Sequence, residues 1–249
     1  MVELTAVGLL NFAGLLWLII CWVGYAKFAH YRAKRSASLS SVLHVHRINW
    51  MRRMLKREIR VGDAALLANI ERNVNFFASS CVLITAGLLT AMTATDKIQA
   101  MLGSISFVAP DSLVQIEFKL LVLIAIFIYS YFTFTWSMRQ FGFASVLFGA
   151  APSPDDDTVT ANDRRSMAIY SAKVIDQASR SYNNGLRAYY FSMAVLSWFI
   201  SPWLFFMATA LVTAILYQRE FLSKSLQAMK MAENVGEKIF NDDKDLYRQ

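Results

Sequence analysis

Residues 120–138 read LLVLIAIFIYSYFTFTWSM, and this stretch decides the fold class. It contains no Lys, Arg, Asp or Glu. At about 1.5 Å per residue, a helix of this length reaches roughly the 30 Å thickness of a bilayer's hydrocarbon core. Soluble cores do not need uncharged runs of that length. The stretch therefore predicts a membrane-spanning helix.

Three other stretches are also uncharged, and charged residues make up 17% of the chain where a soluble domain carries about 25%. Backbone groups in lipid must hydrogen-bond within their own segment, so these stretches should be helices. We expect an all-α integral membrane protein forming a single domain over 1–249, with four transmembrane helices and cytoplasmic helical extensions. The expected spans are about 4–26, 73–95, 118–138 and 188–218, with cytoplasmic connections 27–72 and 139–187 and a C-terminal amphipathic helix at about 219–240.

The distribution of basic residues predicts the orientation. Connection 27–72 carries eleven Lys or Arg and connection 139–187 carries six, whereas Lys97 alone lies between the second and third spans. Positive residues accumulate on the cytoplasmic side, so we expect both basic connections there, in a multi-pass protein of the cell membrane. The N-terminus would then lie outside, and four crossings would place the C-terminus outside too.

The fourth uncharged run, 188–218, is longer than a bilayer requires and carries Ser201-Pro202 near its middle. Proline removes a backbone donor and favours a kink. A single tilted, kinked span is the preferred interpretation. The alternative is a re-entrant pair of half-helices, which would return the C-terminus to the cytoplasm.

Segment 42–60 has apolar residues at helical spacing among many bases, which predicts a basic amphipathic helix on anionic lipid headgroups. This helix either sets the topology and anchors the chain at the membrane surface, or forms an electrostatic funnel that concentrates anions. Nucleic-acid binding is not expected, because the inside-positive bias already explains a pI near 9.5. We expect Asp63 to cap the next helix, and Asn162 or Asp163 to cap a helix leading into the fourth span. The predicted surface residues are Arg47, Arg52, Arg53, Lys56, Arg57 and Arg60.

The chain shows no catalytic, cofactor or metal-binding motif, so we expect no enzyme. His44-x-His46 lacks a third ligand at a suggestive spacing. Glu117 and Lys119 are expected to anchor the outer start of the third span at the interface. Both cysteines are expected to be small packing residues.

Neutral polar residues lie along the second and third spans and just before the fourth span. Such residues pack membrane helices closely through interhelical hydrogen bonds, or they line a water-accessible path between protomers. The sequence Asn183-Asn184-Gly185 could loosen the first turn of the fourth span. Arg139 and Arg187 are expected to close this stripe at its cytoplasmic mouth. The candidate path residues are Ser79, Ser80, Ser130, Thr133, Ser137, Arg139, Gln140, Asn183 and Arg187.

Four motifs, MRRMLKREIRVGD (51–63), NFFASS (75–80), FTWSMRQ (134–140) and SYNNGLRAYY (181–190), together resemble a bacterial and plant family of small membrane proteins known as domain of unknown function 599. The resemblance extends from about Ala26 to Phe221. It implies a shared four-helix fold with its distinctive polar residues on the cytoplasmic side, and it implies no activity.

These observations favour a non-enzymatic, oligomeric, channel-like protein for small solutes or anions. The alternative is an accessory or scaffolding subunit of a larger membrane complex. Expected partners are the lipid bilayer with its anionic headgroups and other copies of the chain, and no cofactor is expected.

Overall fold

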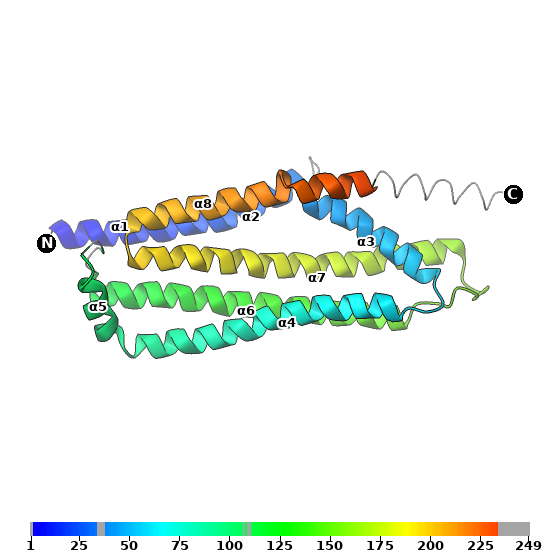
Figure 1. Ribbon diagram of the computed structural model, residues 1–249, viewed down its shortest axis with the longest axis horizontal. Coiled ribbons are helices and arrows are strands. Elements are labelled where there is room, and N and C mark those ends of the chain that lie inside the picture. Colours follow the sequence, from blue (N-terminus) through cyan, green and yellow to red (C-terminus); the bar gives the residue numbers. More distant parts are fainter. Residues whose placement is uncertain (1, 34–37, 107, 109–110, 234–249) are drawn as a thin grey trace. The chain divides into compact units, whose positions relative to one another are not determined.

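The computed structural model describes residues 2–33, 38–106, 108 and 111–233, and every regular element in this part of the chain is a helix (Figure 1). This confirms the all-α class. In chain order the elements are α1 (Val2–Ile19), the π-helical turn η1 (Ile20–Gly24), α2 (Tyr25–Ala33), α3 (Leu39–Leu55), α4 (Val61–Met92), α5 (Thr95–Gly103), α6 (Leu113–Gly149), α7 (Ala161–Leu196), the 3₁₀ turn η2 (Ser197–Phe199) and α8 (Pro202–Phe221).

Four of these helical stretches are long and apolar enough to cross a membrane: Gly8–Ala33, Val61–Met92, Leu113–Gly149 and Pro202–Glu233. α4 has 32 residues and α6 has 37, whereas a crossing needs roughly 20. Both helices therefore extend beyond the apolar segments that the sequence predicts.

The chain divides into two compact units where we expected one domain. Unit 1 comprises Met1–Phe28, Asn69–Arg139 and Ala178–Ile215, and unit 2 comprises Ala29–Ala68, Gln140–Gln177 and Leu216–Gln249. Unit 1 contains most of the uncharged runs. Unit 2 forms because the helix ends that extend beyond those runs pack with α3 and with one another.

The fourth apolar run is not a single kinked helix. α7 ends at Leu196, η2 follows, and α8 begins at Pro202, so the chain reverses direction between α7 and α8 (Figure 1). Pro202 occupies the first position of α8, where a missing N–H costs no helical hydrogen bond. Proline thus starts a new helix here, and it does not kink a continuous one.

Within unit 1, α7 runs antiparallel to α6, and contacts at three levels define their register. The Ser137 hydroxyl donates to the Ala178 carbonyl at 2.7 Å, the Phe127 and Tyr189 rings lie 5.2 Å apart, and Lys119 Nζ reaches the Trp198 carbonyl at 2.9 Å. One face of α7 is buried along this whole length, including Ala188, Phe191, Ser192, Ala194 and Val195.

Unit 2 is built on α3, which buries Val42, Met51, Met54 and Leu55. α3 ends at Leu55, earlier than the predicted residue 60. Its apolar face is covered by protein, whereas Ile59 beyond its end is 78% exposed.

Two predicted helix caps differ in the structure. Asp63 lies in the first turn of α4, where its buried carboxylate accepts hydrogen bonds from Trp50 Nε1 and Arg57, each at 2.6 Å. At the start of α7 the cap is Thr160, whose hydroxyl accepts the Asp163 N–H while the Asp163 carboxylate accepts the Thr160 N–H. This reciprocal pair is a capping box.

Candidate functional site

Four residues on α7 form a polar strip within unit 1. Arg180, Asn183, Arg187 and Tyr190 recur every three or four residues and therefore follow one side of the helix. Arg180 is exposed, Asn183 and Arg187 are half-buried, and Tyr190 is 38% exposed. We call these four residues the α7 strip. It places the guanidinium groups of Arg180 and Arg187 on a partly exposed side of α7 in unit 1.

Arg187 lies level with the middle of the uncharged run of α6. On either side of it along α7, Gly185 packs against Phe134 and Tyr189 packs against Phe127. Phe127 and Phe134 flank the centre of residues 120–138. Arg187 is therefore a basic residue at mid-depth of the apolar segment, and not a residue at its cytoplasmic mouth.

Within the part of the chain that the structure describes, Arg187 contacts neutral groups and no counterion. Its Cζ lies 5.6 Å from the ring centroid of Tyr25, which is 6% exposed, and its Nη1 is 3.5 Å from Asn184 Oδ1. Among the described residues, no carboxylate lies within 4.0 Å of this side chain. A cation–π contact offsets part of the cost of removing a guanidinium from water but does not neutralise it.

The π-helical turn η1 directly precedes Tyr25 and adds aromatic residues beside this site. The Trp22 ring packs edge-on to Tyr129 at 5.2 Å and stacks on Phe191 at 6.1 Å. A π turn inserts extra backbone into a helix and rotates the residues after it, and such turns occur frequently at functional sites. Aromatic side chains of the first helix thus face α6 and α7 close to Arg187.

Apart from Asn183, the other predicted path residues do not converge on Arg187. The hydroxyls of Ser80, Ser130 and Thr133 each donate to the carbonyl four residues earlier in their own helix, as membrane hydroxyls commonly do. Ser137 bonds across helices to Ala178. Ser79 and Arg139 are exposed, and Gln140 is buried within unit 2.

Gly185 does not loosen the start of a span. α7 is helical from Ala161 to Leu196, so Asn183-Asn184-Gly185 lies well inside it. A Cβ at Gly185 would meet Phe134 Cε1 at 2.6 Å, closer than real Cβ contacts allow. The role of this glycine is to let the Phe134 ring pack directly on the α7 backbone.

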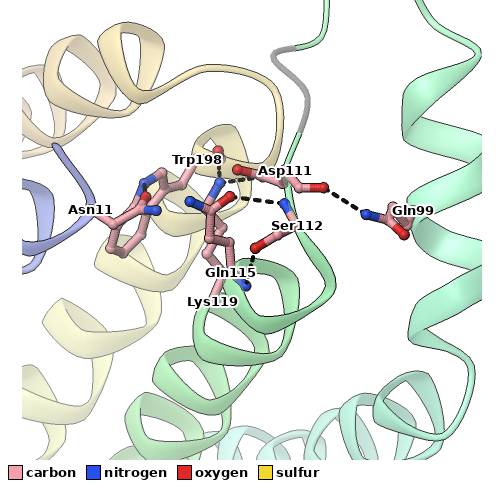
Figure 2. A network of polar contacts seen from close by, with 7 residues as sticks. All are labelled: Asn11, Gln99, Asp111, Ser112, Gln115, Lys119 and Trp198. Atoms are coloured by element: carbon pink, nitrogen blue, oxygen red, sulfur yellow. Dashed lines mark hydrogen bonds and ion pairs between the residues drawn. The ribbon is translucent and has the colours of Figure 1, made fainter. Parts of the chain in front are cut away.

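A second polar cluster surrounds Lys119, which does not anchor the interface as we expected (Figure 2). Lys119 is 1% exposed, and its Nζ donates to Asp111 Oδ2 at 2.5 Å and to the Trp198 carbonyl at 2.9 Å. Trp198 Nε1 donates to Asn11 Oδ1 at 3.1 Å, and Gln99 Nε2 donates to the Asp111 carbonyl at 2.8 Å. The cluster ties α1, α5, α6 and the α7–α8 turn together. The proximity of Lys119 to Trp198 cannot be read from the sequence.

Several predicted lipid-binding bases make contacts inside unit 2. Arg47 pairs with Asp176 at 2.6 Å, Arg57 pairs with Asp63, and Arg60 donates to the Ala151 carbonyl at 2.8 Å. Burial, with a smaller contribution from the nearby Arg165, lowers the pKa of Arg52. These contacts show that the bases help to hold unit 2 together. Binding of anionic lipid by this segment stays a prediction.

Four apolar helices and an all-helical fold define a multi-pass helical membrane protein. Residues 13–225 match the family described as "Protein of unknown function, DUF599", and the chain belongs to this family. No curated protein and no solved structure matches the chain. Among the described residues, no group of three or more His, Cys, Asp or Glu is placed to hold a metal ion.

Proposed function

We propose that this protein is a non-enzymatic, oligomeric permeation protein of the bacterial inner membrane, and that the α7 strip lines a path for small anions. The observation that carries the proposal is Arg187, a guanidinium at mid-depth of the apolar segment with no carboxylate partner among the described residues. A charged side chain at the centre of a bilayer costs about 3 kcal/mol or more. Such a residue ordinarily serves a function that repays this cost.

The surroundings of Arg187 support an anion as the permeant species. A fixed positive charge attracts anions, and neutral polar groups such as Asn183 and Asn184 supply hydrogen bonds without trapping them. One copy does not cover the strip, because Arg180 is exposed and Arg187 is only half-buried. Lipid is a poor neighbour for these groups, so adjoining copies would enclose the strip together with water and anions.

Flux from proteoliposomes tests the proposal. The purified protein is expected to release chloride, nitrate or acetate from loaded vesicles faster than protein-free vesicles do. Arg187→Gln removes the charge at mid-depth and is expected to lower this flux at least about tenfold. Lys173→Gln is the matched control, because Lys173 is an exposed base of the same helix in unit 2. Absence of flux above protein-free vesicles for all three anions contradicts the proposal.

The same strip also favours a second candidate function, that of an accessory subunit. Carboxylates on a membrane helix of another protein would neutralise Arg180 and Arg187 as well as mobile anions would. Native mass spectrometry after extraction in mild detergent separates the two functions. A closed homo-oligomer supports permeation, whereas a fixed complex with a different protein supports the accessory function.

A further inference from the structure

The C-terminal segment is joined to the first basic connection by direct contacts within unit 2. The Ser40 N–H donates to Glu220 Oε1 at 3.2 Å, and His46 Nε2 donates to the Met229 carbonyl at 3.0 Å. Leu226, between these two contacts, is 3% exposed. Residues 216–233 must therefore lie in the same compartment as α3.

Part of connection 139–187 lies in the same compartment as α3. Asp176 of α7 binds both Arg47 and His44 of α3. Side chains in direct contact cannot lie on opposite sides of a bilayer. The segments Ala29–Ala68, Gln140–Gln177 and the described part of Leu216–Gln249 are consequently on one side of the membrane.

The chain passes between the two units five times. These passages fall after Phe28, Ala68, Arg139, Gln177 and Ile215, and at each of them a helix continues without interruption. The helices concerned are α2, α4, α6, α7 and α8 (Figure 1). An odd number of passages leaves the two ends of the chain in different units.

α7 has the length required for one of these crossings. From Ala178 of α7, beside Ser137, to Trp198 of η2, beside Lys119, the chain covers the apolar run of α6 and rises about 30 Å at about 1.5 Å per residue. α7 is not uniformly apolar because other helices cover one of its faces. Alanine, serine and glycine at Ala178, Gly185, Ala188 and Ser192 allow this close packing.

We infer that the Ala178–Leu196 part of α7 crosses the bilayer as a fifth helix, and that the C-terminal segment lies in the cytoplasm, opposite the N-terminus. The charge distribution agrees with this sidedness. Only seven of the 25 Lys and Arg residues belong to unit 1: Lys27, Arg72, Lys97, Lys119, Arg139, Arg180 and Arg187. The inference replaces the expected external C-terminus, and it does not depend on the permeation function.

Labelling of introduced cysteines in intact cells with a membrane-impermeant maleimide tests the five-helix topology. Ser201→Cys, in the α7–α8 turn, is expected to react from outside, as is Ser104→Cys in the loop after α5. Asp157→Cys and Ser225→Cys are expected to react only after the cells are permeabilised. The unaltered protein gives the background, because Cys21 and Cys81 are both buried.

Each labelling outcome bears on the inference. If Ser201→Cys stays unlabelled while Ser104→Cys reacts, residue 201 lies within the bilayer and the fifth crossing is wrong. If Ser225→Cys reacts from outside, the cytoplasmic C-terminus is wrong. A green fluorescent protein fused after Gln249 provides an independent readout. It is expected to fluoresce, whereas alkaline phosphatase fused at the same place is expected to be inactive, and the reverse pair of results overturns the inference.

Discussion

At the residue scale, Gly185 is the position where the smallest substitution should have the largest effect. Gly185→Ala places a Cβ 2.6 Å from Phe134 Cε1, and Phe134 is fully buried beside Phe77 and Tyr182. We expect a loss of about 1–3 kcal/mol in unfolding free energy, because the packed ring has no space to move into. Thermal unfolding in detergent measures this change.

The matched control for this substitution is Gly87→Ala in α4. A Cβ there meets nothing within 4 Å. Alanine favours a helix over glycine, so this variant should unfold at the same temperature or slightly higher. Equal behaviour of the two variants would show that Phe134 does not pack on the α7 backbone as described.

Lys119 is a second residue whose loss should be costly. Lys119→Met leaves the Asp111 carboxylate and the Trp198 carbonyl without their shared donor (Figure 2). Breaking a buried ion pair from one side typically costs about 3–5 kcal/mol, because the remaining charge is uncompensated. The quantity affected is the free energy of unfolding, and we expect the double variant Lys119→Met/Asp111→Asn to recover part of the loss. Lys97→Met, at an exposed lysine of α5, is the control, and an equal effect at Lys97 would contradict the prediction.

At the element scale, the loop between α6 and α7 is held by arginine side chains. Arg164 donates to the carbonyls of Ser153, Pro154 and Asp156, and Arg60 donates to the Ala151 carbonyl. We expect Arg164→Gln to increase the rate of proteinase K cleavage within residues 150–160 by at least about fivefold, equivalent to about 1 kcal/mol of easier local opening. Mass spectrometry of the fragments locates the cut. The neighbouring Arg165→Gln should leave the rate unchanged, and the same acceleration in both variants would contradict the role of Arg164.

The helices themselves illustrate what local sequence can and cannot predict. The uncharged runs correctly predicted the apolar parts of α1, α4 and α6, because lipid constrains the composition of the segments that cross it. The sequence does not predict the reversal of the chain between α7 and α8. Ser201-Pro202 is compatible with a kink or with a reversal, and the decision depends on packing such as the stacked rings of Trp198 and Phe205, 4.5 Å apart.

At the scale of the whole molecule, permeation requires copies of the chain to meet at the α7 strip. We expect Tyr190→Cys to form disulfide-linked dimers in membranes exposed to a mild oxidant, because copies enclosing the strip bring these residues together. Non-reducing electrophoresis detects the linkage. Ala188→Cys is the control, since residue 188 is fully buried on the opposite side of α7. If Tyr190→Cys stays monomeric while the protein is oligomeric, copies associate through another face.

The sequence predicts which residues belong to the candidate site better than it predicts where they lie in the structure. The sequence identifies Asn183 and Arg187 because they are polar residues near an apolar run. It does not give their depth, because α7 carries a charge or an amide every few residues, a pattern typical of a surface helix. The sequence predicts Lys119 at the interface because Trp198, whose carbonyl accepts a hydrogen bond from Lys119 Nζ, lies 79 residues away in the chain.

The fold class and the apolar segments follow from local composition, because the bilayer imposes its requirements on each segment separately. The family follows from sequence motifs along the chain. Contacts between distant segments decide how many helices pass between the units and the level of Arg187 along α6, and they underlie the side of the membrane that we infer for the C-terminal segment. These properties depend on which faces the other helices cover, as α6 covers one side of α7 at Ala178, Gly185 and Tyr189. Burial of a polar helix by its neighbours is a property of packing between distant segments, so composition along the chain does not reveal it.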